Sequence, residues 1–148
     1  MTTKEHTIIV HGRFMNRKEI YPVPPVLAQV KFISKNEGKK CRVDFDGDLM
    51  NMASGRYTLF AKKGCKCVCC GLEGTYFAKE RPRPSARQEQ KVYHFNLYGI
   101  DDEGKEVQIT KDHIIPISKG GKNHIDNYQV MCYSCNMAKK DAVEEVEQ

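Results

Sequence analysis

The sequence lacks any long apolar run. Its first residues, "MTTKEHTIIVHG", have no apolar core of the kind that a secretory signal needs. Nowhere does the chain approach the ~20 consecutive apolar residues of a membrane-spanning helix. These absences predict a soluble cytoplasmic protein with no membrane partner.

The sequence also lacks an internal repeat and a strong excess of charge. With 148 residues and a formal net charge of +5, it has the size of one domain and is mildly basic. Residues 61–91 carry eight Lys or Arg against three acidic residues, whereas residues 92–148 carry six against ten. This split is as typical of scattered solvated charge as of a basic nucleic-acid surface beside a cation-binding end.

Hydrophobic patterning predicts a chain rich in strands. The expected strands are residues 6–14, 27–35, 40–47, 92–100, 105–117 and 128–132. The expected helices are residues 56–63 and 133–148, with a turn at 101–104 and a loop at 118–127. Prolines make residues 21–26 an extended connector, and the polar stretch 78–91 is expected to be an exposed, mobile loop.

Seven cysteines stand out in a chain of this class. A reducing compartment disfavours disulfides, so that metal binding or catalysis is the expected use of these thiols. Cys67 and Cys70 form one C-x-x-C unit, and Cys132 and Cys135 form a second. Two such units can close a tetrahedral four-cysteine zinc site.

Features beside both cysteine units support a metal site. Gly71 can adopt the positive φ that reverses the turn after the first unit, and the second unit lies where the last helix is expected to begin. Cys65 and Cys69 are then extra thiols, although ligand sets that use either of them stay open. The plain alternative is a set of ordinary reduced cysteines. A thioredoxin-like redox site is disfavoured because no βαβ pattern flanks these units.

Polar residues suited to phosphodiester hydrolysis gather in the last third of the chain. Asp112 and His113 are adjacent at an expected strand end, Asn127 follows a Gly-rich loop, and Asn136 comes directly after the second cysteine unit. Hydrolysis needs a base for water and a hard cation for the phosphate charge. Imidazole titrates near neutral pH, and Asp and Asn oxygens suit Mg²⁺ or Mn²⁺. The plain alternative is a strand-end Asp-His pair with unrelated turn asparagines.

The run "DHIIPISKGG…IDNYQVMCYSCNMAKKD", preceded by "CVCCG", resembles the HNH endonuclease family in its zinc-stapled ββα-metal (His-Me finger) form. The resemblance implies an α+β fold with a four-cysteine structural zinc site. It divides the chain into a β-rich N-terminal region of unknown role (1–55), a nuclease domain (56–141) and a tail (142–148).

The resemblance also implies a role for each matching residue. His113 would be the general base that deprotonates the attacking water, and Asn127 would hold its ring. Asp112 and Asn136 would bind the catalytic Mg²⁺ or Mn²⁺, and the two C-x-x-C units would carry Zn²⁺. The products would end in a 5′-phosphate and a 3′-hydroxyl. The family often has His where Asn136 stands, and an amide oxygen there favours a hard cation over a transition metal.

DNA is the expected partner, bound by a monomer or a homodimer. The expected phosphate contacts are basic side chains near the site: Lys139, Lys140, Arg81, Arg83, Lys119 and Lys122. For the basic arm at residues 79–91, a solvated loop is an equal alternative.

Two rival functions stay in view. One is a zinc-stabilised DNA-binding module without catalysis, and the other is an RNA or structure-specific nuclease. The complete set of Asp, His and Asn residues favours the DNA endonuclease. Of the other histidines, His94 is expected to be structural, and His11 has no partner that sequence can identify.

Overall fold

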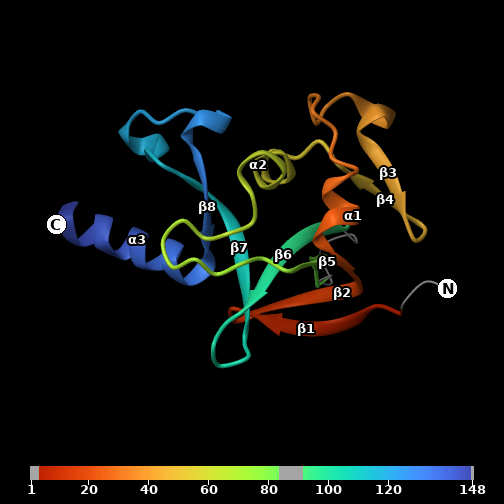
Figure 1. Ribbon diagram of the computed structural model, residues 1–148, viewed down its shortest axis with the longest axis horizontal. Coiled ribbons are helices and arrows are strands. Elements are labelled where there is room, and N and C mark those ends of the chain that lie inside the picture. Colours follow the sequence, from red (N-terminus) through yellow and green to blue (C-terminus); the bar gives the residue numbers. More distant parts are fainter. Residues whose placement is uncertain (1–3, 84–91, 148) are drawn as a thin grey trace.

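The computed structural model describes residues 4–83 and 92–147, and a six-stranded antiparallel sheet forms its centre (Figure 1). The strand order is β1-β2-β5-β6-β7-β8. Their bounds are His6–Val10, Arg13–Pro22, Tyr76–Pro82, His94–Ile100, Glu106–His113 and Tyr128–Cys132. β3 (Arg42–Phe45) and β4 (Asp48–Asn51) form a separate hairpin. The helices are α1 (Val23–Leu27), α2 (Gly55–Lys63) and α3 (Tyr133–Glu147).

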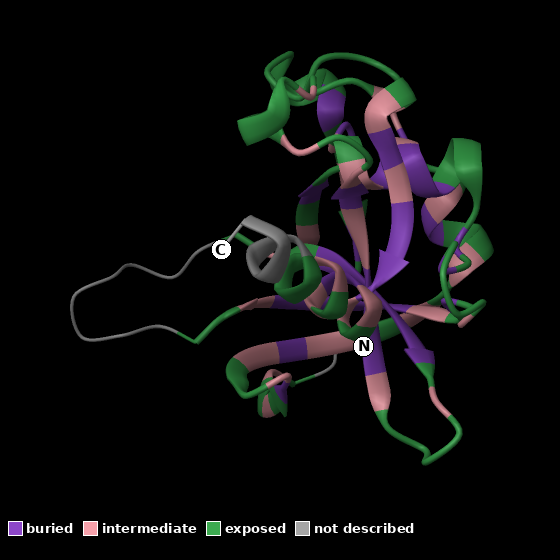
Figure 2. Ribbon diagram, turned by 90° about the vertical axis from the view of Figure 1, so that its left-hand side faces the viewer, coloured by how far each residue is buried: buried purple, intermediate pink, exposed green. Residues whose placement is uncertain are grey.

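These elements make a mixed α+β fold, as the sequence predicts. Buried positions concentrate along the strands of the large sheet, and the outer loops are exposed (Figure 2). Short 3-10 turns at Gly38–Cys41, Ile117–Lys119 and Ile125–Asn127 interrupt the loops. No helix in the described ranges is long and apolar enough to cross a membrane.

Helix α2 closes the core against one face of the sheet. Its first N–H groups are capped by the Ser54 hydroxyl, which accepts from the Arg56 backbone N–H at 3.2 Å. Tyr57, Leu59 and Phe60 are buried against strand side chains. Each such burial contributes roughly 1.5–3 kcal/mol relative to exposure. The expected helix at residues 56–63 is therefore confirmed.

The N-terminal region differs from the sequence predictions. The expected strand at residues 6–14 is a hairpin, which turns at His11 and Gly12 with φ of 50° and 75°. Prolines were expected to exclude a helix from residues 21–26, but α1 begins at Val23 because proline fits the first turn of a helix. The expected strand at 27–35 is wrong, since residues 28–35 form turns and irregular backbone.

The prediction of an exposed loop at residues 78–91 is wrong for its first part. Residues 78–82 belong to β5, and both Lys79 and Glu80 are fully buried. Lys79 Nζ lies 2.6 Å from a carboxylate oxygen of Glu19, and the Arg17 guanidinium lies 2.6 Å from Glu80. Buried charges persist only when they are paired in this way. Residues 84–91 of the expected loop, which include Arg87, lie outside the described residues.

The later strands follow the sequence predictions closely. The expected strands at 92–100 and 128–132 are β6 and β8, and the expected final helix is α3. The expected strand at 105–117 is β7, which ends earlier, at His113. The chain leaves the sheet there because the next residues lead into Pro116 and a 3-10 turn.

The turn between β1 and β2 docks the N-terminal region onto the rest of the molecule. The His11 ring stacks on Tyr133 at the start of α3, with ring centroids 3.7 Å apart. The backbone N–H of Gln108 on β7 donates to His11 Nε2 at 3.1 Å. Together with the β2–β5 pairing, these contacts extend one sheet across the expected boundary between residues 1–55 and 56–141.

We predict that this docking weakens in mild acid. Burial lowers the pKa of His11, and the Arg13 charge adds to this against the opposing effect of Glu106. The unfolded His11, with a pKa near its ordinary value of about 6.5, therefore takes up a proton before the folded one does. The free energy of unfolding should fall as the pH falls from about 7 to about 5.

The variant His11→Asn isolates this effect, because asparagine tolerates positive φ and does not titrate. Urea denaturation over the same pH range should show a smaller loss of stability in the variant. The remaining slope is expected to include His94, whose pKa is also lowered. Identical slopes for the two proteins would contradict the assignment to His11.

Candidate active site and metal centre

The end of β7, the segment that follows it and the first turns of α3 surround one cavity of about 340 Å³. Antiparallel pairing sets Asp112 opposite Gln129 and His113 opposite Tyr128. The residues that line the cavity are Lys111, Asp112, His113, Pro116, Ile117, Asn136, Lys139 and Lys140. The structure thus brings together all the predicted catalytic side chains except Asn127.

The Asp112 carboxylate is buried and held from two sides. Its Oδ2 accepts from Gln129 Nε2 at 2.9 Å and from Lys139 Nζ at 2.7 Å. Lys139 Nζ also donates to the backbone oxygen of His113 at 2.8 Å. Lys139 therefore compensates the charge of the carboxylate and fixes the strand end, and its contact with DNA stays a prediction.

Asn136 presents an oxygen that suits a cation. Its Nδ2 donates to Thr110 Oγ1 at 3.0 Å, which fixes the orientation of the amide. Its Oδ1 is buried and has no hydrogen-bond partner within the described ranges. An unsatisfied buried acceptor costs roughly 1–3 kcal/mol, so a ligand at this oxygen would stabilise the site. With the Asp112 carboxylate lining the same cavity, the donor set fits a hard divalent cation.

The His113 ring is oriented by a residue that the sequence did not single out. Its Nε2 lies 2.7 Å from Asn123 Oδ1, and its ring meets Tyr128 edge-on at 5.1 Å. Because an amide oxygen only accepts, this contact fits a ring with its proton on Nε2, which leaves Nδ1 facing away from Asn123. The only signal for Asn123 in the sequence is its place in the Gly-rich loop before Asn127.

Asn127 holds the loop that follows His113. Its side chain donates to the backbone oxygens of Ile115 and Lys122 at 3.0 and 2.9 Å, and it accepts from the Ile115 N–H at 2.9 Å. Gly121 permits this packing, because a Cβ there would lie 1.8 Å from the Ile115 oxygen. The contacts of Asn127 thus reach the backbone beyond His113, while Asn123 contacts the ring.

The two C-x-x-C units meet in one cluster. The sulfurs of Cys67, Cys70, Cys132 and Cys135 all lie within 4.8 Å of one another. The Cys70 and Cys132 sulfurs are 3.8 Å apart, which is the edge of a tetrahedron with Zn–S bonds of about 2.3 Å. The cluster of these four cysteines therefore fits a zinc ion, and it includes neither Cys65 nor Cys69 among the described residues.

Local backbone geometry assembles the first unit. The Gly71 N–H donates to the Cys67 oxygen at 3.0 Å, and Gly71 has the positive φ of 80° that the sequence predicts. The Val68 N–H donates to Val130 on β8 at 2.9 Å, which attaches this turn to the sheet.

The pKa values of the Cys67 and Cys65 thiols are shifted in opposite directions. Burial raises the pKa of Cys67, but hydrogen bonds from the backbone of Cys70, Cys132 and Cys69 outweigh it and lower the pKa to about 6. Burial raises the pKa of Cys65 to about 11, with a contribution from Glu73. Cys67 is thus prepared as a thiolate ligand, whereas Cys65 stays a protonated, buried thiol.

The remaining predicted DNA contacts fall into two groups. Arg81 forms a two-pronged ion pair with Glu5, at 2.6 and 2.9 Å, and Arg83 lies over the Phe14 ring at 5.4 Å. The other group consists of exposed lysines: Lys140 lines the His113 cavity, and Lys119 and Lys122 lie in the loop between β7 and β8. Binding of DNA by either group stays a prediction.

We predict that zinc stabilises this cluster. Cys67→Ala and Cys132→Ala each remove one of four sulfur ligands, so zinc content and the melting temperature should both fall. Cys69→Ala is the matched control, because Cys69 is exposed and lies outside the cluster. Zinc per chain is measured by elemental analysis and melting by circular dichroism. Loss of zinc in Cys69→Ala, or full zinc in Cys67→Ala, would contradict the ligand assignment.

Comparison with known proteins agrees with this local arrangement. A family model described as HNH endonuclease matches residues 101–146, which contain β7, its loop, β8 and most of α3. The match includes Cys132 and Cys135 but not the first cysteine unit. No curated protein and no solved structure matches the chain. This match confirms the resemblance to the HNH endonuclease family over residues 101–146.

Proposed function

We propose that this protein is a divalent-metal-dependent DNA endonuclease, which hydrolyses phosphodiester bonds to 5′-phosphate and 3′-hydroxyl ends. The observation that carries the proposal is the convergence of the His113 imidazole, the Asp112 carboxylate and the unpartnered Asn136 oxygen on one cavity. The segment from β7 through β8 to α3 would be its ββα-metal core, with a structural Zn²⁺ at the four-cysteine cluster.

His113 would perform the proton transfer. With Nε2 held by Asn123, the lone pair on Nδ1 accepts a proton from water. The water oxygen then forms a bond to phosphorus as the bond to the 3′ oxygen breaks. Asp112 and Asn136 would hold Mg²⁺ or Mn²⁺, which supplies charge stabilisation to the scissile phosphate and the leaving 3′ oxygen. Lys139 keeps Asp112 and the end of β7 in place.

The strand–strand–helix arrangement suits a DNA backbone. A hairpin with a helix beside it can straddle a minor groove and present its cavity to one phosphate, with few base contacts. Lys140, which lines the cavity, and the exposed Lys119 and Lys122 of the loop between β7 and β8 would add phosphate contacts. Such contacts give affinity with little sequence preference.

A plasmid assay tests the proposal. With Mg²⁺ or Mn²⁺ the wild type should nick or linearise supercoiled DNA, and His113→Ala should lose about 10²–10⁴-fold in rate, the usual contribution of a general base. Zinc content and melting temperature of the variant should match the wild type. Equal cleavage by both proteins would refute the mechanism. Binding without cleavage by the wild type would favour the non-catalytic DNA-binding module, and preference for RNA of the same sequence would change the substrate.

Asn123 offers a sharper test of how the base is oriented. Asn123→Ala should lower kcat by roughly 10-fold or more, because the ring loses its fixed tautomer. Asn123→Asp keeps an acceptor for Nε2 but adds a negative charge, which raises the pKa of a neighbouring imidazole. Its rate should therefore need a higher pH. The measurement is the pH profile of kcat.

Ser118→Ala is the matched control for Asn123, since Ser118 is an exposed side chain of the same loop. It should keep the profile of the wild type. If Asn123→Asp shows an unshifted profile while its kcat falls, Asn123 supports the loop and does not act on the ring.

A further inference from the structure

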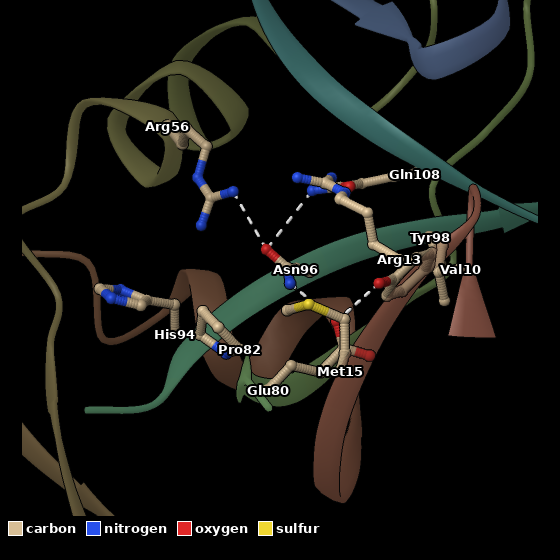
Figure 3. Close-up of a pocket in the computed structure, with 10 residues that line it drawn as sticks. All are labelled: Val10, Arg13, Met15, Arg56, Glu80, Pro82, His94, Asn96, Tyr98 and Gln108. Atoms are coloured by element: carbon tan, nitrogen blue, oxygen red, sulfur yellow. Dashed lines mark hydrogen bonds between the residues drawn. The ribbon is translucent and has the colours of Figure 1, made fainter. Parts of the chain in front are cut away.

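A second cavity, of about 210 Å³, opens on the sheet between the N-terminal hairpin and α2 (Figure 3). We call it the arginine pocket. Its lining residues are Val10, Arg13, Met15, Arg56, Glu80, Pro82, His94, Asn96, Tyr98 and Gln108. None of them lines the cavity beside His113, so the function proposed above does not use this pocket.

The pocket exists because two neighbouring strands separate. The pairing of β6 with β7 ends at Leu97 and Ile109, after which β7 continues beside β8 alone. Arg56 reaches from α2 to the part of β6 that β7 leaves. Its guanidinium donates to Asn96 Oδ1 and to the Phe95 backbone oxygen, both at 3.0 Å.

Two positive charges face the pocket without a carboxylate of their own. Arg56 donates to neutral acceptors, and Arg13 is exposed and makes no side-chain hydrogen bond or ion pair within the described ranges. Figure 3 shows both guanidinium groups pointing toward the part of the pocket where the Asn96 and Gln108 amides lie. Two like charges in one cavity repel each other, so an anion between them would stabilise the arrangement.

Glu80, the acidic residue of the pocket, is already satisfied. It is fully buried and accepts from Arg17 Nε at 2.6 Å, from Asn96 Nδ2 at 2.7 Å and from the Tyr98 hydroxyl at 2.6 Å. Glu80 is therefore held by Arg17, which also pairs with Glu106 at 2.9 Å, and neither Arg13 nor Arg56 donates to this carboxylate within the described residues.

The other polar groups suit an anion as well. Gln108 is 8 % exposed, and its Nε2 has only a long contact of 3.4 Å to Asn96 Oδ1, which leaves it able to donate to a ligand. Desolvation and the Arg56 charge lower the pKa of His94, consistent with a positive potential. Val10, Met15 and Pro82 add apolar surface to the lining, which suits a sugar.

The position along β7 relates the pocket to the candidate active site. Gln108 and Asp112 are four residues apart on β7, so both side chains point to the same face at a separation of about 13 Å. A nucleic-acid strand carries one phosphate per roughly 3.4 Å of helix axis. Because strand phosphates also rotate around this axis, the spacing corresponds to a few nucleotides at most.

We propose that the arginine pocket binds a backbone phosphate of the nucleic-acid strand, a few nucleotides from the scissile phosphate. The identity of the strand as substrate rests on the proposed nuclease function, whereas the affinity for a phosphate group rests on Arg13, Arg56 and Gln108 alone. The N-terminal hairpin, which contributes Arg13, would then be part of the substrate-binding surface.

The test is equilibrium binding of a fluorescein-labelled DNA duplex, followed by anisotropy at several salt concentrations. Full-length zinc-loaded protein is used without Mg²⁺ or Mn²⁺, so that no strand is cut. Arg13→Ala should weaken binding by about 5- to 10-fold and reduce the slope of log K against log salt by about 0.9, the value for one lost phosphate contact. Arg13→Glu should weaken binding further.

Arg42→Ala is the matched control, because Arg42 is an exposed arginine on the separate β3–β4 hairpin and its loss removes the same charge. Its affinity and slope should stay close to those of the wild type. Equal losses in Arg13→Ala and Arg42→Ala would overturn the proposal, since long-range charge alone would explain them. Melting curves check that each variant is folded.

Competition separates a strand phosphate from a free one. Inorganic phosphate and dAMP should displace the duplex only weakly from the wild type. Tight binding of dAMP that depends on Arg13, without an effect of Arg13 on duplex affinity, would overturn the assignment to a strand. The same experiments test the nuclease function separately. If the wild type never cleaves DNA but its salt slope depends on Arg13, the phosphate site is supported and the nuclease function is refuted. If the wild type cleaves DNA and Arg13→Ala has no effect on binding, the nuclease function is supported and the phosphate site is refuted.

Discussion

The four-cysteine cluster is the constraint on which the candidate active site depends. Its sulfurs join a turn that precedes β5 to the junction of β8 and α3. Asn136 follows Cys135 directly, so the position of its amide oxygen beside Asp112 is set where the last sulfur is held. Bringing four thiols together is costly without a metal, since each thiolate repels the next. A zinc ion there would order the catalytic helix without taking part in the chemistry.

A network of buried charges ties the N-terminal region to the same sheet. Lys79 and Glu80 are fully enclosed, and their partners come from β2 and from the β3–β4 hairpin. Removing one partner of such a pair would strand a buried charge and cost about 3–5 kcal/mol. The first third of the chain is therefore part of the structural support of the site, and it also supplies Arg13 to the arginine pocket.

Local patterns predicted the part of the fold in which neighbours in sequence are also neighbours in space. The C-x-x-C units, the strand end at Asp112 and His113, and the helix that carries Asn136 belong to this part. The burial of residues 78–82 was not predictable from the sequence. A lysine such as Lys79 is expected at the surface, and its ion pair with Glu19 forms only in the folded sheet. Arg13 was missed for the same reason, because its pocket is lined by strands distant in sequence. Asn123 is only ten residues from His113 and was missed because the path of the loop between them cannot be read from a sequence pattern.

The central claim is that Asp112 and Asn136 hold a catalytic cation beside His113, apart from the cysteine cluster. The most direct measurement is the rate of DNA cleavage against Mn²⁺ concentration for the wild type and Asn136→Ala, with zinc per chain determined in the same samples. If Asp112 and Asn136 hold this cation, cleavage by the wild type should saturate with Mn²⁺, and the variant should lose cleavage or need much more Mn²⁺ at unchanged zinc content. An unchanged Mn²⁺ dependence in Asn136→Ala would contradict it.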